Sequence, residues 1–444
     1  MNTKFDKTIR KCIDSLRGYF AYEDCSKIFI YIVFLKYIID NKKITFNTNT
    51  FNVFLNAQRM FYQSDLEKEV ITNLNYIIEN HFNMASGSLT EFSNLYFRVV
   101  EFKKPQRTNI IEELKSITFE NESEALIDSL KAILFDNASN FGRIMGDAMS
   151  TQSLSKLVKE ILTLEENERF ADFTYGYGLS SLEITKDVKC KLTGYDIQKQ
   201  TSTMAIMLLI IAEKENFDIY NEDITRINIP LNSFDKISSF PPLGIKVREF
   251  ASYTENLLQE FGFPVKTTNL EVLIALQGIK SLKENGTMVL SITPNNLCSA
   301  TTVEKKFREL ITKKYLSAVI TLPSLYYGTS IATNLIILER NRKLNNILFV
   351  NARSNEFFPF EHKDKKYQND LTDEAINKII EIIKDRQIID GISYSCSIDE
   401  IIENDFILSP SRYVQIKREK QTLSNKEINE QLKNLYNKLK EIIK

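Results

Sequence analysis

The chain is 444 residues long, with 57 Lys and Arg against 58 Asp and Glu, so its formal net charge is −1. At about 150 residues per domain this length predicts two or three domains, and the balanced charge argues against a protein that holds nucleic acid by bulk electrostatics. Five Cys without a CxxC pair and two His predict neither a disulfide framework nor a metal site. The apolar runs 28–35 and 204–212 are too short to span a membrane. Without a signal-like start, we expect a cytoplasmic protein with no membrane partner.

The first part of the chain has few residues that break helices. Residues 1–140 contain two Gly and one Pro, which predicts a helical domain over 1–140. Apolar residues recur at helical spacing over 5–40, with an interruption at Gly18. The segment 103–108, which holds three basic residues, is expected to be a loop suited to phosphate contacts. A further helix is expected from about 120–123 through Leu134.

The pattern changes after Gly142 to short apolar runs that alternate with helical stretches. Strands are predicted at 170–174, 191–196, 217–220, 235–239, 287–292, 318–322, 331–339 and 346–351. Helices are predicted at 198–215, 270–283 and 302–313. This alternation predicts an α/β, doubly wound and mostly parallel sheet. A ligand is then expected at the carboxyl ends of the first strands.

The end of the chain has an apolar stripe typical of a helix that meets a partner. From Thr422 onward, apolar residues follow a 4,3,4,3 spacing. The spacing predicts a coiled-coil seam, which would also allow an oligomer, or a helix that docks on a protein partner. A helix packed on its own domain explains the stripe equally well. The stripe consists of Ile428, Leu432, Leu435, Leu439 and Ile442.

Acidic residues and glycines accompany the first three predicted strands in order. Asp172 is followed by Gly176 and Gly178, where glycine lets the backbone turn tightly and approach a ligand. Asp196 ends the second strand, where an acid can bind both hydroxyls of a ribose. Asp223 follows the third, where an acid or its neighbour can read an adenine amino group. The ordered series predicts an adenosyl-type ligand.

Simpler interpretations exist for each member of this series. A G-x-G sequence alone is a weak signal, because an ordinary turn from strand to helix also uses it. The commonest role of an acid placed like Asp196 is a solvated helix N-cap.

In this order the residues resemble the modification subunit of type I restriction-modification systems, a family of DNA adenine-N6 methyltransferases. The segment 172–178 is similar to the family's Asp-Pro-x-x-Gly-x-Gly loop, and Ser150-Thr151-Gln152 sits where the family has Phe-Thr-Pro beside the methionine end of the cofactor. Tyr195-Asp196-Ile197 occupies the ribose-binding strand. Further similar stretches are 14–18, 33–40, 204–209, 286–294, 307–311, 319–323, 326, 329, 333–339 and 409–413.

The resemblance implies a Rossmann-like seven-strand S-adenosylmethionine-dependent methyltransferase fold over 141–400, between the helical domain and a C-terminal tail and partner-docking helix at 401–444. It implies S-adenosylmethionine as cofactor, DNA as substrate and a specificity-type subunit as partner. The residues implied to bind the cofactor are Thr151, Asp172, Thr174, Gly176, Gly178, Asp196, Ile197 and Asp223. No metal is implied.

The catalytic motif departs from the family's (Asn/Asp)-Pro-Pro-(Tyr/Phe). Here it reads Phe240-Pro241-Pro242-Leu243. Phe240 has no acceptor for an adenine amino group, and Leu243 has no ring to stack on a flipped base. Losing such an acceptor costs about 10²–10³ in rate by analogy with oxyanion-hole deletions. The alternative to an enzyme is therefore a catalytically inactive scaffold with this fold that binds DNA or a protein.

The cofactor loop departs as well. Phe173, Tyr175 and Tyr177 are bulky where the family has small residues, so a narrowed or filled pocket is expected. Beyond the fourth strand, Phe250, Tyr253, Phe261 and Phe263 are expected to face the target base or, alternatively, to fill the core beneath their loop.

Overall fold

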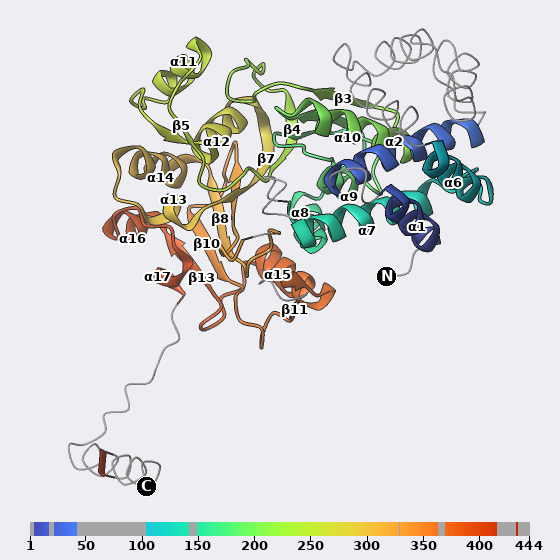
Figure 1. The fold of residues 1–444 in the computed structure, drawn as a ribbon. Coiled ribbons are helices and arrows are strands. Elements are labelled where there is room, and N and C mark those ends of the chain that lie inside the picture. Colours follow the sequence, from blue (N-terminus) through green and yellow to red (C-terminus); the bar gives the residue numbers. More distant parts are fainter. Residues whose placement is uncertain are drawn as a thin grey trace.

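The computed structural model describes residues 4–16, 22–41, 104–141, 149–327, 329–362, 369–414 and 432–433. Up to Phe141 these residues form helices, and from Arg169 they form a large sheet with helices on both of its faces (Figure 1). Of the expected C-terminal stripe, only Leu432 lies within the described residues. None of the described helices is long and apolar enough to cross a membrane.

The helical part consists of α1 (Asp6–Leu16), α2 (Tyr22–Asp40), α6 (Lys104–Lys115) and α7 (Ser123–Phe141). In α1, Ile9, Cys12 and Leu16 are buried at helical spacing. The loop expected at 103–108 is wrong, because α6 begins at Lys104. Pro105 therefore lies in the first turn of a helix, where its missing N–H would have no partner in any case.

Within the described residues, nine strands form one sheet in the order β13-β10-β8-β9-β7-β4-β1-β2-β3. β9 runs antiparallel to β7 and β8, β13 runs antiparallel to β10, and the other neighbours are parallel. The predicted mostly parallel sheet is therefore confirmed. The strands are β1 (Arg169–Asp172), β2 (Lys191–Tyr195), β3 (Phe217–Tyr220), β4 (Phe234–Ser239), β7 (Leu282–Ile292), β8 (Leu316–Thr321), β9 (Asn334–Glu339), β10 (Asn346–Asn351) and β13 (Ser393–Ser397).

The sheet has nine strands in the described residues, against the seven of the fold that the resemblance implies and the eight predicted from apolar runs. β10 and β13 extend it beyond β8. β13 was not predicted, because its sequence Ser-Tyr-Ser-Cys-Ser lacks the apolar run of a central strand and it lies at an edge. Two small ladders accompany the main sheet: β5 (Lys246–Val247) with β6 (Thr268–Asn269), and β11 (Phe360–His362) with β12 (Asn369–Leu371).

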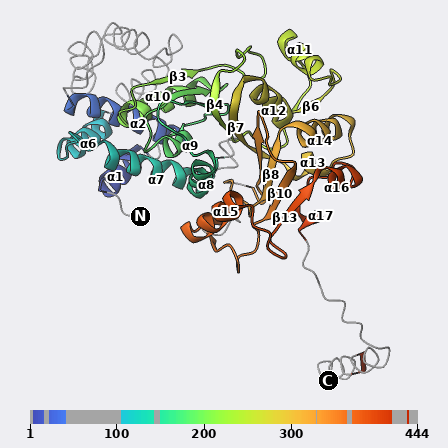
Figure 2. The same ribbon diagram turned by 180° about the vertical axis from the view of Figure 1, so that it is seen from behind.

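Each face of the sheet has its own apolar core. Phe170 and Val289 contribute to one core, while their neighbours Ala171 and Leu290 contribute to the other, as strand alternation requires. The first core also holds the helical part, α8 (Gln152–Leu162), α9 (Leu179–Ile184), α10 (Lys199–Ile211) and α15 (Asp373–Asp385). The second holds α11 (Ser252–Glu260), α12 (Leu270–Ser281), α13 (Pro294–Cys298), α14 (Thr302–Lys314), α16 (Ile398–Glu403) and α17 (Pro410–Tyr413), as Figure 2 shows from behind.

The strand order reverses next to β1. From β1 the chain continues to β2 and β3 on one side, and then returns to β4 and β7 on the other. In an open α/β sheet such a switch point leaves a crevice at the carboxyl ends of the two strands.

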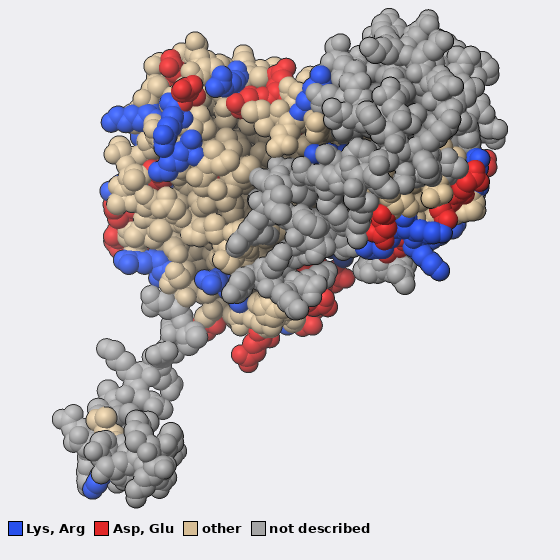
Figure 3. All heavy atoms as spheres, in the orientation of Figure 1, with Lys and Arg blue, Asp and Glu red and all other residues tan. Residues whose placement is uncertain are grey.

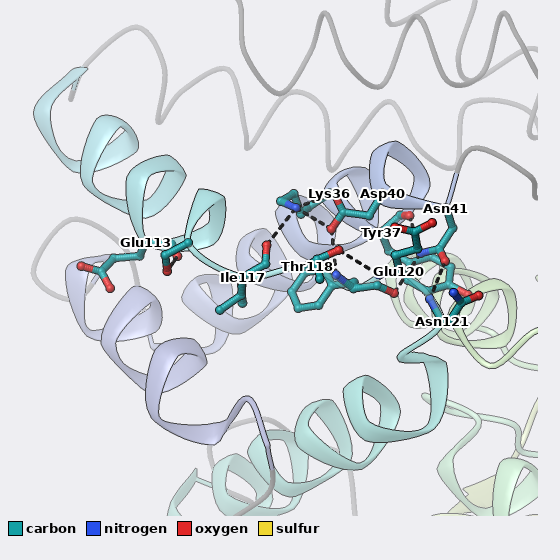
Figure 4. A network of polar contacts seen from close by, with 11 residues as sticks. Lys36, Tyr37, Asp40, Asn41, Glu113, Ile117, Thr118, Glu120 and Asn121 are labelled. Atoms are coloured by element: carbon teal, nitrogen blue, oxygen red, sulfur yellow. Dashed lines mark hydrogen bonds and ion pairs between the residues drawn. The ribbon is translucent and has the colours of Figure 1, made fainter.

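A polar network fastens the helical part together and to the sheet (Figure 4). The buried ammonium of Lys36 pairs with Asp40 and donates to the carbonyl oxygen of Ile117 at 3.2 Å. Asp40 also accepts a hydrogen bond from the backbone N–H of Phe119 at 2.9 Å. Tyr37 donates its hydroxyl to Glu213, just beyond α10, at 3.0 Å. One turn of α2 therefore contacts both the loop before α7 and the sheet part.

Replacing Asp40 with Ala should lower the free energy of unfolding by about 3–5 kcal/mol, because Lys36 would remain buried without its partner. Urea unfolding measures the change. The exposed pair of Lys11 and Glu113 supplies the control, since Lys11→Ala should change stability little. Equal shifts for the two variants would contradict the role given to the buried pair.

Candidate ligand-binding site

A cavity of about 370 Å³ opens at the carboxyl ends of β1, β2 and β4. This volume lies within the range of small-molecule sites. The switch point thus holds a cavity where the sequence predicted a ligand. Eight of the predicted site residues line it: Asp172, Thr174, Gly176, Asp196, Ile197, Asp223, Phe240 and Pro242.

Four predicted site residues lie outside the cavity wall. Thr151 is buried, and its hydroxyl lies 3.1 Å from that of Ser153. Its neighbours Met149 and Ser150 do line the cavity. Gly178, Pro241 and Leu243 are not among the residues that line the cavity.

The buried carboxylate of Asp172 holds the loop after β1. Ser181 donates its hydroxyl to Oδ2 at 2.7 Å, and the N–H of Thr174 donates to Oδ1 at 3.1 Å. Because burial removes the carboxylate from water, it raises the pKa of Asp172 to about 6. The two hydrogen bonds favour the charged form and oppose this rise.

Asp196 ties the glycine loop to the end of β2. Its Oδ2 accepts from the N–H of Gly176 at 2.9 Å, and its Oδ1 accepts from the N–H of Gln198 at 2.7 Å. The N-cap of α10 is Gln198, so the simpler role proposed for Asp196, a helix N-cap, does not apply. Each carboxylate oxygen can accept a second hydrogen bond. Asp196 can therefore hold the loop and still face a hydroxylated ligand.

The ring of Tyr175 leaves no room for a side chain at position 178, so this position must be glycine. Gly178 has φ +74°, and a Cβ there would lie 2.5 Å from a ring atom of Tyr175. A Cβ at Gly194 on β2 would lie 2.4 Å from the same ring. Two glycines thus make room for a buried tyrosine beneath the loop.

The bulky loop residues do not fill the pocket. Phe173 is buried, with its ring centroid 5.8 Å from that of Tyr195 and 6.1 Å from that of Phe234. Tyr175 is buried as described above. Phe173, Tyr175 and Tyr177 all belong to the lining of the cavity, and their buried side chains still leave about 370 Å³ open. The expectation of a filled pocket is therefore wrong.

The far end of the cavity lies beyond β2 and β3. Tyr195 lines the cavity there and is backed by the ring of Tyr220, with centroids 5.3 Å apart, and Ile197 is 69% exposed beside the cavity. Asp223 accepts from the N–H and the hydroxyl of Thr225 at 2.9 and 2.7 Å. This end offers apolar surface for a flat ring and carboxylates at its border.

The motif after β4 is joined to the loop after β1. The N–H of Phe240 donates to Oγ1 of Thr174 at 2.8 Å, and this oxygen lies 3.0 Å from the hydroxyl of Ser239. Phe240 itself is 8% exposed and forms part of the wall. On the far side of the motif, Gly244 donates its N–H to the buried Glu271 at 3.1 Å. The backbone of the motif is held at both ends, while its first side chain has no polar atom.

Several wall residues were missed from the sequence. Phe135 comes from α7 in the helical part, and Leu270 and Ile274 come from α12. Only tertiary packing brings them here, so no local pattern could reveal them. Ser155 could have been found, because it lies one helical turn after Thr151.

The aromatic residues beyond β4 mostly pack inward. Phe263 is buried, while Phe250 and Phe261 are partly buried against the same core. Tyr253 donates its hydroxyl to Gln277 at 2.7 Å. The core-filling alternative therefore describes these rings better than exposure to a target base.

Basic side chains gather near this segment. On the face in Figure 3 they lie over the region that Figure 1 labels α11 and β5, and Lys246, Arg248 and Lys266 are exposed in the segment. The side chains of 103–108, expected to contact phosphates, lie outside the described residues. Within the described ranges, no group of three or more His, Cys, Asp or Glu is arranged to hold a metal ion.

The strand order from β3 to β8, the antiparallel β9 and the cavity at the switch point define the fold of the S-adenosylmethionine-dependent methyltransferases. Residues 122–422 match the family model described as N-6 DNA methylase. The chain belongs to this family.

Relatives that match most of the chain support this membership. The chain is 25% identical over 433 residues to the MpnII methylase subunit of a type I restriction enzyme from Mycoplasma pneumoniae, covering 88% of this chain and 78% of that protein. It is 24% identical to the MjaVII methylase subunit from Methanocaldococcus jannaschii, covering 98% and 82%. A type I methyltransferase subunit from Streptococcus thermophilus has the same fold, with a TM-score of 0.71, 22% identity and coverage of 93% and 100%.

Replacing Gly178 with Ala should destabilise the chain by at least ~1 kcal/mol more than replacing Gly176 with Ala. Both positions have positive φ, so an alanine at either one would cost about 1–2 kcal/mol for adopting the left-handed backbone conformation. Only a Cβ at Gly178 would also meet the Tyr175 ring, since no atom lies within 4 Å of one at Gly176. Urea midpoints measure the difference, and equal losses would contradict the packing described.

The raised pKa of Asp172 predicts a pH-dependent stability. Because its folded-state pKa of about 6 exceeds the unfolded value near 4, the native state holds the proton more tightly. The carboxyl's contribution is complete below about pH 4 and is lost as the pH rises through about 6. Relative to Asp172→Asn, the free energy of unfolding of the wild type should fall by roughly 3 kcal/mol over this range. Parallel pH profiles for the two proteins would refute this.

Proposed function

We propose that the chain binds S-adenosylmethionine and acts on DNA adenine N6 as the modification subunit of a type I restriction-modification system, together with a specificity subunit. One observation carries the proposal: an open cavity at the switch point whose wall combines the glycine loop, Asp196 and Asp223 with Phe240 and Pro242. Family membership and relatives along nearly the whole chain support it.

The residues of the cavity fit an adenosyl ligand. Asp196 has acceptor capacity left for ribose hydroxyls after binding Gly176 and Gln198. Tyr195 and the exposed Ile197 offer apolar contact for the adenine ring, and Asp223 lies at the border for its amino group. S-adenosylmethionine, when bound, supplies the methyl group.

At the end of the cavity where a target base would enter, the residues of the chain hold the backbone of the Phe240–Leu243 motif in place. Thr174 fixes the backbone of Phe240 through its hydroxyl, and Glu271 fixes Gly244. These contacts hold the Pro-Pro turn beside the cavity, where a carbonyl oxygen of the turn can accept from an adenine amino group. Phe240 offers a ring face but no second acceptor, so we expect slow transfer.

A second candidate function rests on that same residue. Because Phe240 removes a preorganised acceptor, a subunit that binds the cofactor but transfers no methyl group is the alternative. In that case the chain is a scaffold that presents DNA or a protein partner. The helix expected at 422–444, which would dock the partner, falls almost wholly outside the described residues.

Two measurements on the full chain test the proposal. In calorimetry S-adenosylmethionine should bind, and Asp196→Ala should weaken binding about tenfold or more, because charge-assisted hydrogen bonds are lost. With labelled cofactor and adenine-rich DNA, Phe240→Asn should raise the rate by about 10²–10³ over the wild type. Phe240→Leu is the matched control and should give no increase.

The outcomes separate the candidates. Absence of binding at millimolar S-adenosylmethionine would refute both the enzyme and the cofactor-binding scaffold. Binding with transfer only in Phe240→Asn would favour the scaffold, and transfer by the wild type would favour the enzyme.

A further inference from the structure

A second hollow of about 250 Å³ lies where the loop after β8 meets the β11–β12 ladder. We name it the β11 hollow. Because β8 and β10 are parallel to β1 and β4, the loops that follow them lie at the same edge of the sheet as the main cavity. The residues that matter in its lining are Ser324, Ser330, Arg353, Phe360, His362 and Asn369.

The β11 hollow has one permanently charged cation, Arg353, beside the imidazole of His362. Arg353 and His362 are exposed, and neither has an ion-pair partner among the residues that the structure describes. Among the described residues of the ladder, strand alternation places the acids on the other face: His362 pairs with Asn369, while Glu361 pairs with Asp370 on the opposite face. A guanidinium in this setting suits a phosphate.

The hollow also has features that an isolated phosphate would not use. Phe360 lies in the wall, with its ring edge-to-face against His362 at 5.2 Å between centroids. Asn369 donates to the carbonyl oxygen of Ser324 at 3.3 Å, but its Oδ1 is buried without a hydrogen-bond partner. A buried acceptor needs a donor, and an aromatic ring offers a surface for stacking a base. Phosphate, flat ring and N–H donor occur together in a nucleotide.

One loop joins the β11 hollow to the main cavity. Ser324 and Ser330 line the hollow. Between them, the carbonyl oxygen of Leu325 accepts from the N–H of Thr151 at 2.9 Å, and the N–H of Tyr327 donates to Met149 at 2.8 Å. Met149 belongs to the wall of the main cavity. The loop that lines the β11 hollow therefore also holds the backbone of Met149 and Thr151 next to the main cavity.

We propose that the β11 hollow binds one unstacked nucleotide of the DNA strand, next to the base presented to the main cavity. Arg353 contacts its phosphate, Phe360 stacks on its base, and Asn369 Oδ1 accepts from the base. This inference rests on the proposed action on DNA and adds a second contact point for the strand.

The test measures binding of a short, fluorescein-labelled, adenine-rich single-stranded oligonucleotide by anisotropy across salt concentrations, with S-adenosylmethionine present. Arg353→Ala should lower the slope of log K against log salt by about 0.7, the value for one phosphate on a single strand. Phe360→Leu should weaken binding about five- to hundredfold through lost stacking. Arg169→Ala is the matched control, because this exposed arginine begins β1 at the opposite edge of the sheet.

Calorimetry with S-adenosylmethionine checks that each variant keeps the folded main cavity. If Arg353→Ala and Arg169→Ala lower the slope equally while the wild type binds DNA, the β11 hollow is refuted and the proposed function stands. If the wild type binds the cofactor but no DNA even at low salt, both the hollow and the action on DNA are refuted. If Phe360→Leu keeps cofactor affinity and loses DNA affinity, the hollow is supported.

Discussion

The buried carboxylate of Asp172 is the constraint on which the site depends. It lies at the end of β1, out of contact with water, and accepts from Ser181 and from the N–H of Thr174. These two bonds fix the start of the glycine loop against α9. Burial raises the pKa of Asp172, so the stability of the folded chain depends on pH through this carboxyl group. The loop in turn positions Gly176 for Asp196.

The same loop governs the target end of the cavity. Because Thr174 bonds to the N–H of Phe240, the turn after β4 is held by backbone geometry and not by its first side chain. The turn can therefore stay in place although Phe240 carries no acceptor. Beyond the segment 323–333, the β11 hollow adds polar and aromatic groups along the same edge of the sheet.

Local patterns determined the larger elements. A strand buried on both faces reads as an apolar run, which is why 346–351 was predicted with the bounds that the structure has. The edge strand 217–220 was also predicted with its bounds, because its apolar residues Phe217 and Ile219 alternate with polar ones. The ordered acids and glycines were equally visible, because each follows directly from its own strand. Exceptions arose where local signals were weak or ambiguous, as at the polar edge strand β13 and at the helix that begins with Pro105 in its first turn.

The sequence by itself determined a mostly parallel α/β sheet and the place of a cavity at the ends of its first strands, because chain order and strand direction place those ends together. Only the tertiary structure decided whether that site is open. The rings of Phe173 and Tyr175 are buried, and the place of the Tyr175 ring depends on the space left by Gly178 and Gly194. It also brought Phe135 from α7 into the wall. Such contacts join residues distant in the chain, and no local spacing encodes them.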